Sequence, residues 1–203
     1  MKQSKWALTA LLALLFVGTG FSQKVMLVSG DLSFLKGQKD LNVEYDFSEF
    51  AVGDYNSEGE YKAKKIKEHN SAEAGKGDKW SASWENAKTH VYPAKFEELA
   101  NAGLSKGGMK VTQGNDAASY TLIVKTTFIE PGFNVGVMKK PAAVSFEYIF
   151  VDKKDPSKEL AKLTHRLVPG SQFGGNDYDA GTRIAESYAK GGKMLAATMA
   201  KSL

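Results

Sequence analysis

Three stretches in the second half of the chain alternate apolar and polar residues, and this period of two constrains the fold more than any other feature. They are residues 120–129, 144–150 and 161–167. Such alternation predicts β-strands, and the second and third stretches each have one strongly apolar face. The first stretch has apolar residues on both faces, which predicts a central or twisted strand. The polar segment 152–157 separates the second stretch from the third and contains Pro156, which predicts a hairpin loop. Residues 41–47 alternate in the same way, so the sequence predicts a sheet built largely from hairpins.

Helical signals lie between and after these strands. Ser57 and Glu60 have the spacing of a capping box, which predicts a helix over residues 58–69. A second apolar stripe has helical spacing, and we expect Asp78 to cap its helix and Pro93 to end or kink it. Its residues are Trp80, Trp84, Ala87 and Val91. A long final helix is predicted over residues 180–202, where Gly191-Gly192 indicates either a close contact or a break. The predicted fold class is therefore α+β: a mostly antiparallel sheet with helices packed on one face and a long C-terminal helix.

Residues 1–22 have the organisation of a secretory signal peptide. Lys2 and Lys5 precede a twelve-residue, mainly apolar run, and Gly20 and Ser22 fit the small-residue positions before a cleavage site. The alternative is a membrane anchor, but a bilayer span needs about 20 apolar residues, which is longer than this run. We therefore expect export of residues 23–203 as a single α+β domain, in the periplasm or the medium of a bacterium. No other stretch is long and apolar enough to span a membrane.

Composition excludes several classes of function. The chain has no cysteine, which removes disulfides, thiolate nucleophiles and a lipidated N-terminal cysteine, and only three histidines are present. We expect no metal and no cofactor. The formal net charge of +4 includes Lys2 and Lys5, so it falls to +2 when the signal peptide is removed. A net charge this small gives no reason to expect a nucleic-acid partner.

The sequence contains no recognisable catalytic constellation. A G-x-S-x-G nucleophile motif is absent. His165 lies on the predicted apolar face of its strand, where a histidine is more often a core residue than a base. A hydrolase using His165 with Glu147 remains an alternative, because only the hairpin register decides whether the two side chains can meet.

Two glycine-rich segments carry the candidate binding residues. Each places apolar side chains among glycines, which is unusual for loops that only meet solvent. The candidates for binding a ligand or partner are Phe133, Val135 and Met138 in the first segment and Phe173, Gly174 and Gly175 in the second. Trp80 and Trp84, one helical turn apart, are further candidates as a stacking platform for a sugar, with packing in the core as the alternative.

The C-terminal half resembles a known layout. Its pattern runs through Ser119-Tyr120-x-Leu122, Pro131-Gly132, residues 142–152, Leu160-Ala161 and Gly174-Gly175. Over about residues 109–203 this pattern resembles uncharacterised bacterial envelope families and is loosely similar to the periplasmic α+β domain of curli-secretion lipoproteins. The lipidated cysteine of those lipoproteins is missing here. The resemblance implies a non-enzymatic domain in an envelope assembly and transfers no active-site residue.

Together these observations predict an exported, non-catalytic envelope protein that binds another macromolecule or assembles with itself. Two alternatives stay open. One is a small-molecule or glycan-binding protein that uses Trp80 and Trp84, and the other is a hydrolase that uses His165.

Overall fold

The structure is a computed structural model that describes residues 24–135, 138–170 and 180–203. The predicted signal peptide and the candidate residues Phe173, Gly174 and Gly175 lie outside the described residues.

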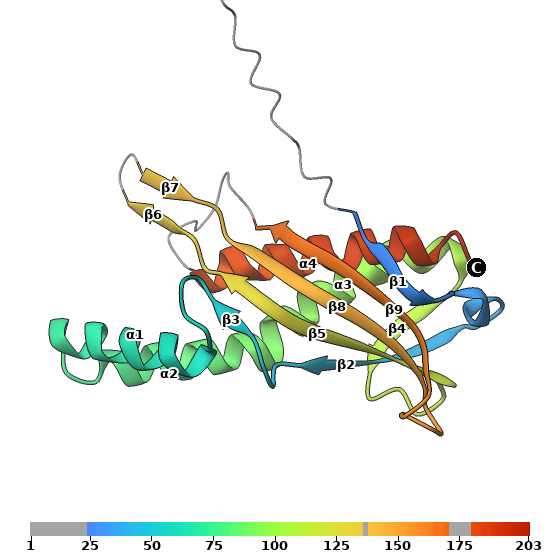
Figure 1. Cartoon of the computed structure of the whole chain (residues 1–203), viewed down its shortest axis with the longest axis horizontal. Helices are drawn as coiled ribbons and strands as arrows, with labels where there is room; N and C mark the ends of the chain where they lie inside the picture. Colours follow the sequence, from blue (N-terminus) through green and yellow to red (C-terminus); the bar gives the residue numbers. More distant parts are fainter. Residues whose placement is uncertain (1–23, 136–137, 171–179) are drawn as a thin grey trace, which may run out of the picture.

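An open seven-stranded sheet forms one layer of the molecule (Figure 1). Its strand order is β1-β9-β8-β5-β2-β4, and β3 pairs with β5 off this path. The strands are β1 (Met26–Gly30), β2 (Asp40–Asp46), β3 (Ala51–Val52), β4 (Lys110–Gln113), β5 (Tyr120–Glu130), β8 (Ala143–Asp152) and β9 (Glu159–Pro169). The long ladders β5–β8 and β8–β9 and the edge pair β1–β9 are antiparallel, whereas β2, β3 and β4 join in parallel.

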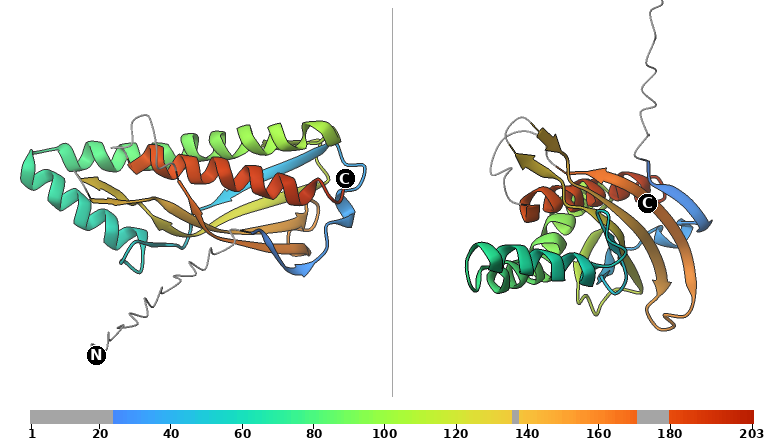
Figure 2. Two further views of the ribbon diagram at one scale, coloured as in Figure 1. Left: turned by 90° about the horizontal axis from the view of Figure 1, so that it is seen from above. Right: turned by 60° about the vertical axis from the view of Figure 1, so that its left-hand side comes forward.

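Helices cover one face of this sheet, which confirms the α+β class. They are α1 (Glu58–Ala72), α2 (Lys76–Asn86), the π-helical turn η2 (Ala87–Val91), α3 (Tyr92–Leu104) and α4 (Ala180–Met199), with short 3₁₀ turns η1 (Ser33–Leu35) and η3 (Ser105–Gly107). Helices α3 and α4 lie side by side along the sheet, and α1 and α2 form a hairpin that extends past its end (Figures 1 and 2).

The alternation of β8 explains its place in the core. Phe146, Tyr148 and Phe150 point toward the helices and are fully or almost fully buried, as the period of two predicts. Tyr188 of α4 packs edge-on against Phe146, with ring centroids 4.9 Å apart, and the Tyr188 hydroxyl hydrogen-bonds with Thr126 of β5 at 2.5 Å. Helix and sheet are therefore joined by aromatic packing and one buried hydroxyl pair.

Gly192 lets α4 approach α3 closely. A Cβ added at this position would lie 2.3 Å from the Phe96 carbonyl oxygen, far inside van der Waals contact. The neighbouring Gly191 faces the sheet, where an added Cβ would lie 3.0 Å from the Phe146 ring and 3.1 Å from the Tyr148 hydroxyl oxygen. Of the two readings of this glycine pair, the close contact is confirmed, because α4 runs through both residues without a break.

The structure bears on two local predictions about the tryptophan helix, and the predicted cap is wrong. Gly75, in a left-handed conformation, precedes α2, whereas Asp78 lies in its first turn and is not the cap. Pro93 does not end the helical path, because it lies in the first turn of α3, which continues directly from η2. The π turn η2 accommodates the junction, so regular α geometry is interrupted just before the proline, at residues 87–91.

A second correction concerns the end of β9. Ala161, Leu163 and His165 are buried as expected, but Leu167 is 50% exposed and Val168 takes the buried position. The cause is a bulge. Val144 pairs with Val168 and Phe146 pairs with His165, so the two residues Arg166 and Leu167 lie opposite the single residue Ser145. An extra residue reverses the inside–outside alternation that the sequence pattern assumes.

Candidate functional site

The first glycine-rich segment forms a two-stranded arm that projects from the end of the sheet (Figure 1). Its strands are β6 (Phe133–Val135) and β7 (Met138–Lys140), which pair antiparallel and connect β5 to β8. The Phe133 side chain is 43% exposed and that of Met138 is 63% exposed. Val135 pairs with Met138 across the arm. The arm therefore presents two large apolar side chains to solvent.

The base of the arm is fixed to the body by a buried arginine. Arg183 of α4 is 5% exposed, and its guanidinium donates to the Pro131 carbonyl oxygen at 3.1 and 3.3 Å and to that of Gly132 at 3.2 Å. These three bonds to carbonyl oxygens at the start of the arm tie the arm to α4. Sequence reasoning missed Arg183, because its partners are more than 50 positions away and no motif connects them.

A crowded glycine and an ion pair also hold the base of the arm in place. Gly132 has a φ of +64°, and an added Cβ would meet the Lys140 carbonyl oxygen at 2.4 Å, so a side chain fits neither the conformation nor the space. Across the base, Lys140 Nζ lies 2.6 Å from Glu130 Oε2. A short two-stranded ribbon is marginally stable alone. These contacts supply the support that the ribbon itself cannot.

The two candidate tryptophans lie in the helical hairpin rather than under the sheet. The Trp84 ring is 4% exposed, and its indole Nε1 donates to Glu58 Oε1 at 2.5 Å. Trp80 is half-buried, with His69 stacked on it at 5.7 Å and Trp84 at 5.6 Å. The two rings are engaged with each other and with α1. They also border a cavity of about 530 Å³ between α2, η2 and the start of α4.

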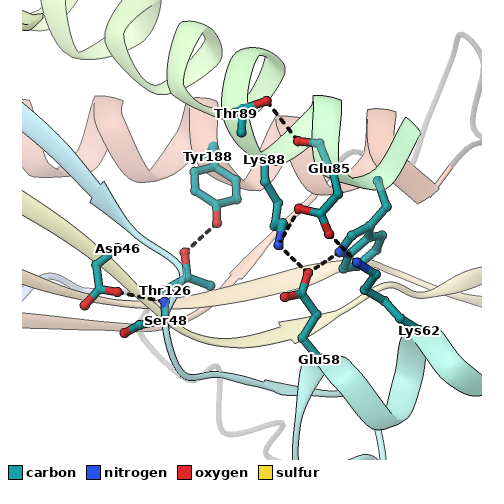
Figure 3. A network of polar contacts seen from close by, with 10 residues as sticks. Asp46, Ser48, Glu58, Lys62, Glu85, Lys88, Thr89, Thr126 and Tyr188 are labelled. Atoms are coloured by element: carbon teal, nitrogen blue, oxygen red, sulfur yellow. Dashed lines mark hydrogen bonds and ion pairs between the residues drawn. The ribbon is translucent and has the colours of Figure 1, made fainter. Parts of the chain in front are cut away.

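A charged network joins the hairpin to the π turn (Figure 3). Lys88, in η2, lies 2.6 Å from Glu58 of α1 and 3.0 Å from Glu85 of α2, and Glu85 also pairs with Lys62. The Lys88 ammonium is buried and lies 5.9 Å from the ring centroids of both Phe47 and Phe50. Two lysines and two glutamates balance in charge. This arrangement fits a structural lock between α1 and η2, since it leaves no unpaired group for chemistry.

His165 and Glu147 face opposite sides of the sheet. His165 is fully buried on the helix side, and its Nδ1 lies 3.2 Å from the Tyr148 hydroxyl. Burial raises the pKa of Tyr148 well above its ordinary value, so this hydroxyl stays neutral. Glu147 is on the other face, where it pairs with Lys162 at 3.0 Å. The register thus separates the acid and base that the hydrolase alternative required.

Comparisons with known proteins give no family. No family model matches the chain, and no curated protein matches it. Among solved structures, the PelC dodecamer from Paraburkholderia phytofirmans is 16% identical, with 85% of this chain and 96% of that chain covered and a TM-score of 0.41. A variant of the same protein gives 17% identity, 85% and 98% coverage and a TM-score of 0.39.

Protein XCC0632 from Xanthomonas campestris, of the DUF330 family, is also similar. It is 13% identical and covers 51% of this chain and 58% of its own, with a TM-score of 0.33. Similarity at this level does not carry the partners or assembly of those proteins over to this chain.

Within residues 24–135, 138–170 and 180–203, no helix has the length and apolar character to cross a bilayer. In the same part of the chain, His, Asp and Glu side chains form no cluster of three that could hold a metal ion.

Proposed function

We propose that the protein is exported to the bacterial envelope and acts without catalysis, by docking the β6–β7 arm on another envelope protein or on a second copy of this chain. The observation that carries the proposal is the exposure of Phe133 and Met138 on an arm whose base is held by Arg183. Exposed aromatic and methionine side chains are the usual anchors of protein interfaces. The predicted signal peptide and the resemblance to envelope assembly domains support the proposed location.

The contribution of the two side chains can be estimated. Full burial of a phenylalanine or methionine side chain stabilises by about 1.5–3 kcal/mol, and roughly half of each is already buried in this chain. Covering both in an interface therefore contributes about 2 kcal/mol, which is roughly a thirtyfold change in affinity.

The test is capture of crosslinked complexes from envelope extracts, together with sedimentation velocity for self-association. The arm variant carries Phe133→Ser and Met138→Ser. Met26→Ser is the matched control, because Met26 is also 63% exposed but lies on the edge strand β1. We expect the arm variant to lose the complex and the control to keep it. Equal recovery and equal sedimentation of arm variant and wild type would contradict the proposal.

A further inference from the structure

Two bulges lie on either side of the central strand β8, one in its pairing with β5 and one in its pairing with β9. The helices lie on one face of this sheet and leave the other face uncovered within the described residues (Figure 2). On β5 the register shifts between Thr126 and Phe128, and on β9 it shifts between His165 and Val168. Both irregularities lie opposite the same residue of the central strand, Ser145. Bulges re-aim side chains and are common beside functional sites.

The β9 bulge holds a leucine in a strained conformation. Leu167 has a φ of +48°, the one positive value among the described residues other than glycine. Its backbone N–H donates to Ser145 Oγ at 3.0 Å, and Thr127 Oγ1 donates to the Ser145 carbonyl oxygen at 3.2 Å. Glycine is the residue that this backbone conformation favours. Leu167 therefore combines a strained backbone with an apolar side chain that is 50% exposed.

The two bulges enclose a shallow pocket of about 620 Å³. Its lining combines an aromatic ring, an aliphatic side chain, hydroxyls and both charge types: Phe128, Leu167, Ser145, Thr164, Glu147 and Arg166. Arg166 is exposed and forms no ion pair within the part of the chain that the structure describes. Glu147 uses Oε2 for Lys162, so Oε1 can still accept a hydrogen bond.

We propose that this double-bulge pocket binds a saccharide residue that carries a carboxylate, as a hexuronate does. Arg166 pairs with the carboxylate, since a guanidinium matches its two oxygens in one plane. The free carboxylate oxygen of Glu147 accepts a hydrogen bond from one sugar hydroxyl, and the Thr164 hydroxyl forms a hydrogen bond with another. The Phe128 ring and the Leu167 side chain contact the apolar face of the sugar. Because no helix of the described residues covers this face, a longer saccharide can extend past the pocket on either side.

The proposal does not depend on the arm, because none of these side chains belongs to β6 or β7. Binding by the arm and binding in the pocket can therefore fail separately.

The test is titration of the purified protein with trigalacturonate, followed by calorimetry and amide chemical shifts, with neutral galactotriose as the second probe. We expect the largest shifts at Phe128, Ser145 and Leu167. Arg166→Gln should weaken binding of trigalacturonate at least tenfold. Lys154→Gln, an equal charge change at the far end of the β8–β9 hairpin, should change binding less than twofold.

Leu167→Gly separates binding from folding. Glycine suits the backbone of the bulge, so this variant should unfold at no lower temperature than wild type yet bind trigalacturonate several-fold more weakly. Four results would overturn the proposal: no binding of trigalacturonate at millimolar concentration, equal binding of neutral galactotriose, equal losses in Arg166→Gln and Lys154→Gln, or tighter binding of triglutamate, which would indicate an acidic peptide instead.

Discussion

Removing the Arg183 guanidinium should loosen the arm and destabilise the protein. The side chain makes three hydrogen bonds to the carbonyls of Pro131 and Gly132, at 3.1–3.3 Å. A hydrogen bond to a charged group contributes about 1.5–3 kcal/mol, and three long bonds from one guanidinium are taken at about 1 kcal/mol each. Arg183→Ala should therefore lower the free energy of unfolding by about 3 kcal/mol, because the carbonyl oxygens of Pro131 and Gly132 lose their donor.

Urea denaturation measures this change, and hydrogen exchange of the β6 and β7 amides measures the loosening of the arm. Arg166→Ala is the control, because Arg166 is exposed and should change stability by less than about 0.5 kcal/mol. An Arg183→Ala variant as stable as the control, with unchanged exchange in the arm, would refute the anchoring role.

Three further predictions concern packing, pH and the charged network. Gly192→Ala should cost about 2 kcal/mol by overpacking against α3, whereas Gly59→Ala, whose added Cβ meets nothing closer than 3.8 Å, should be neutral or stabilising in thermal melts. Burial raises the pKa of Glu97 above its ordinary 4.5, so the folded state binds this proton more tightly than the unfolded state does. Stability should therefore fall as pH rises from about 4.5 through the folded pKa, and Glu97→Gln should remove that part of the dependence in urea titrations at several pH values. Lys88→Met should cost about 2 kcal/mol, because Glu58 loses its buried counter-charge, and an unchanged denaturation midpoint would speak against the lock.

Local patterns in the sequence predicted the elements whose signals are local. Alternation predicted β5, β8 and β9, and the Ser57–Glu60 capping box predicted α1, where the Glu60 N–H does donate to Ser57 Oγ at 3.2 Å. Trp84 is buried, as the packing alternative expects, but Trp80 is half-buried and both rings pack in the helical hairpin instead of against the sheet. Each of these signals involves residues only a few positions apart.

Features that depend on distant residues could not be predicted. The parallel pairing of β2 with β4 and β5 joins segments about 70–80 positions apart, and no local pattern specifies such a partner. The bulge that exposes Leu167 depends on the register with β8, so its side chain could not be assigned to a face. In the sequence, Arg183 is a charged residue within the apolar pattern of the final helix, and only the fold shows which carbonyl groups it contacts.

The most direct test of the account is photocrosslinking in living cells from position 133, with p-benzoylphenylalanine in place of Phe133. The account predicts one discrete adduct with an envelope protein or with a second copy of the chain, and no such adduct when the same probe replaces Met26. Identical adducts from both positions, or none from position 133, would contradict the role of the arm as the docking element.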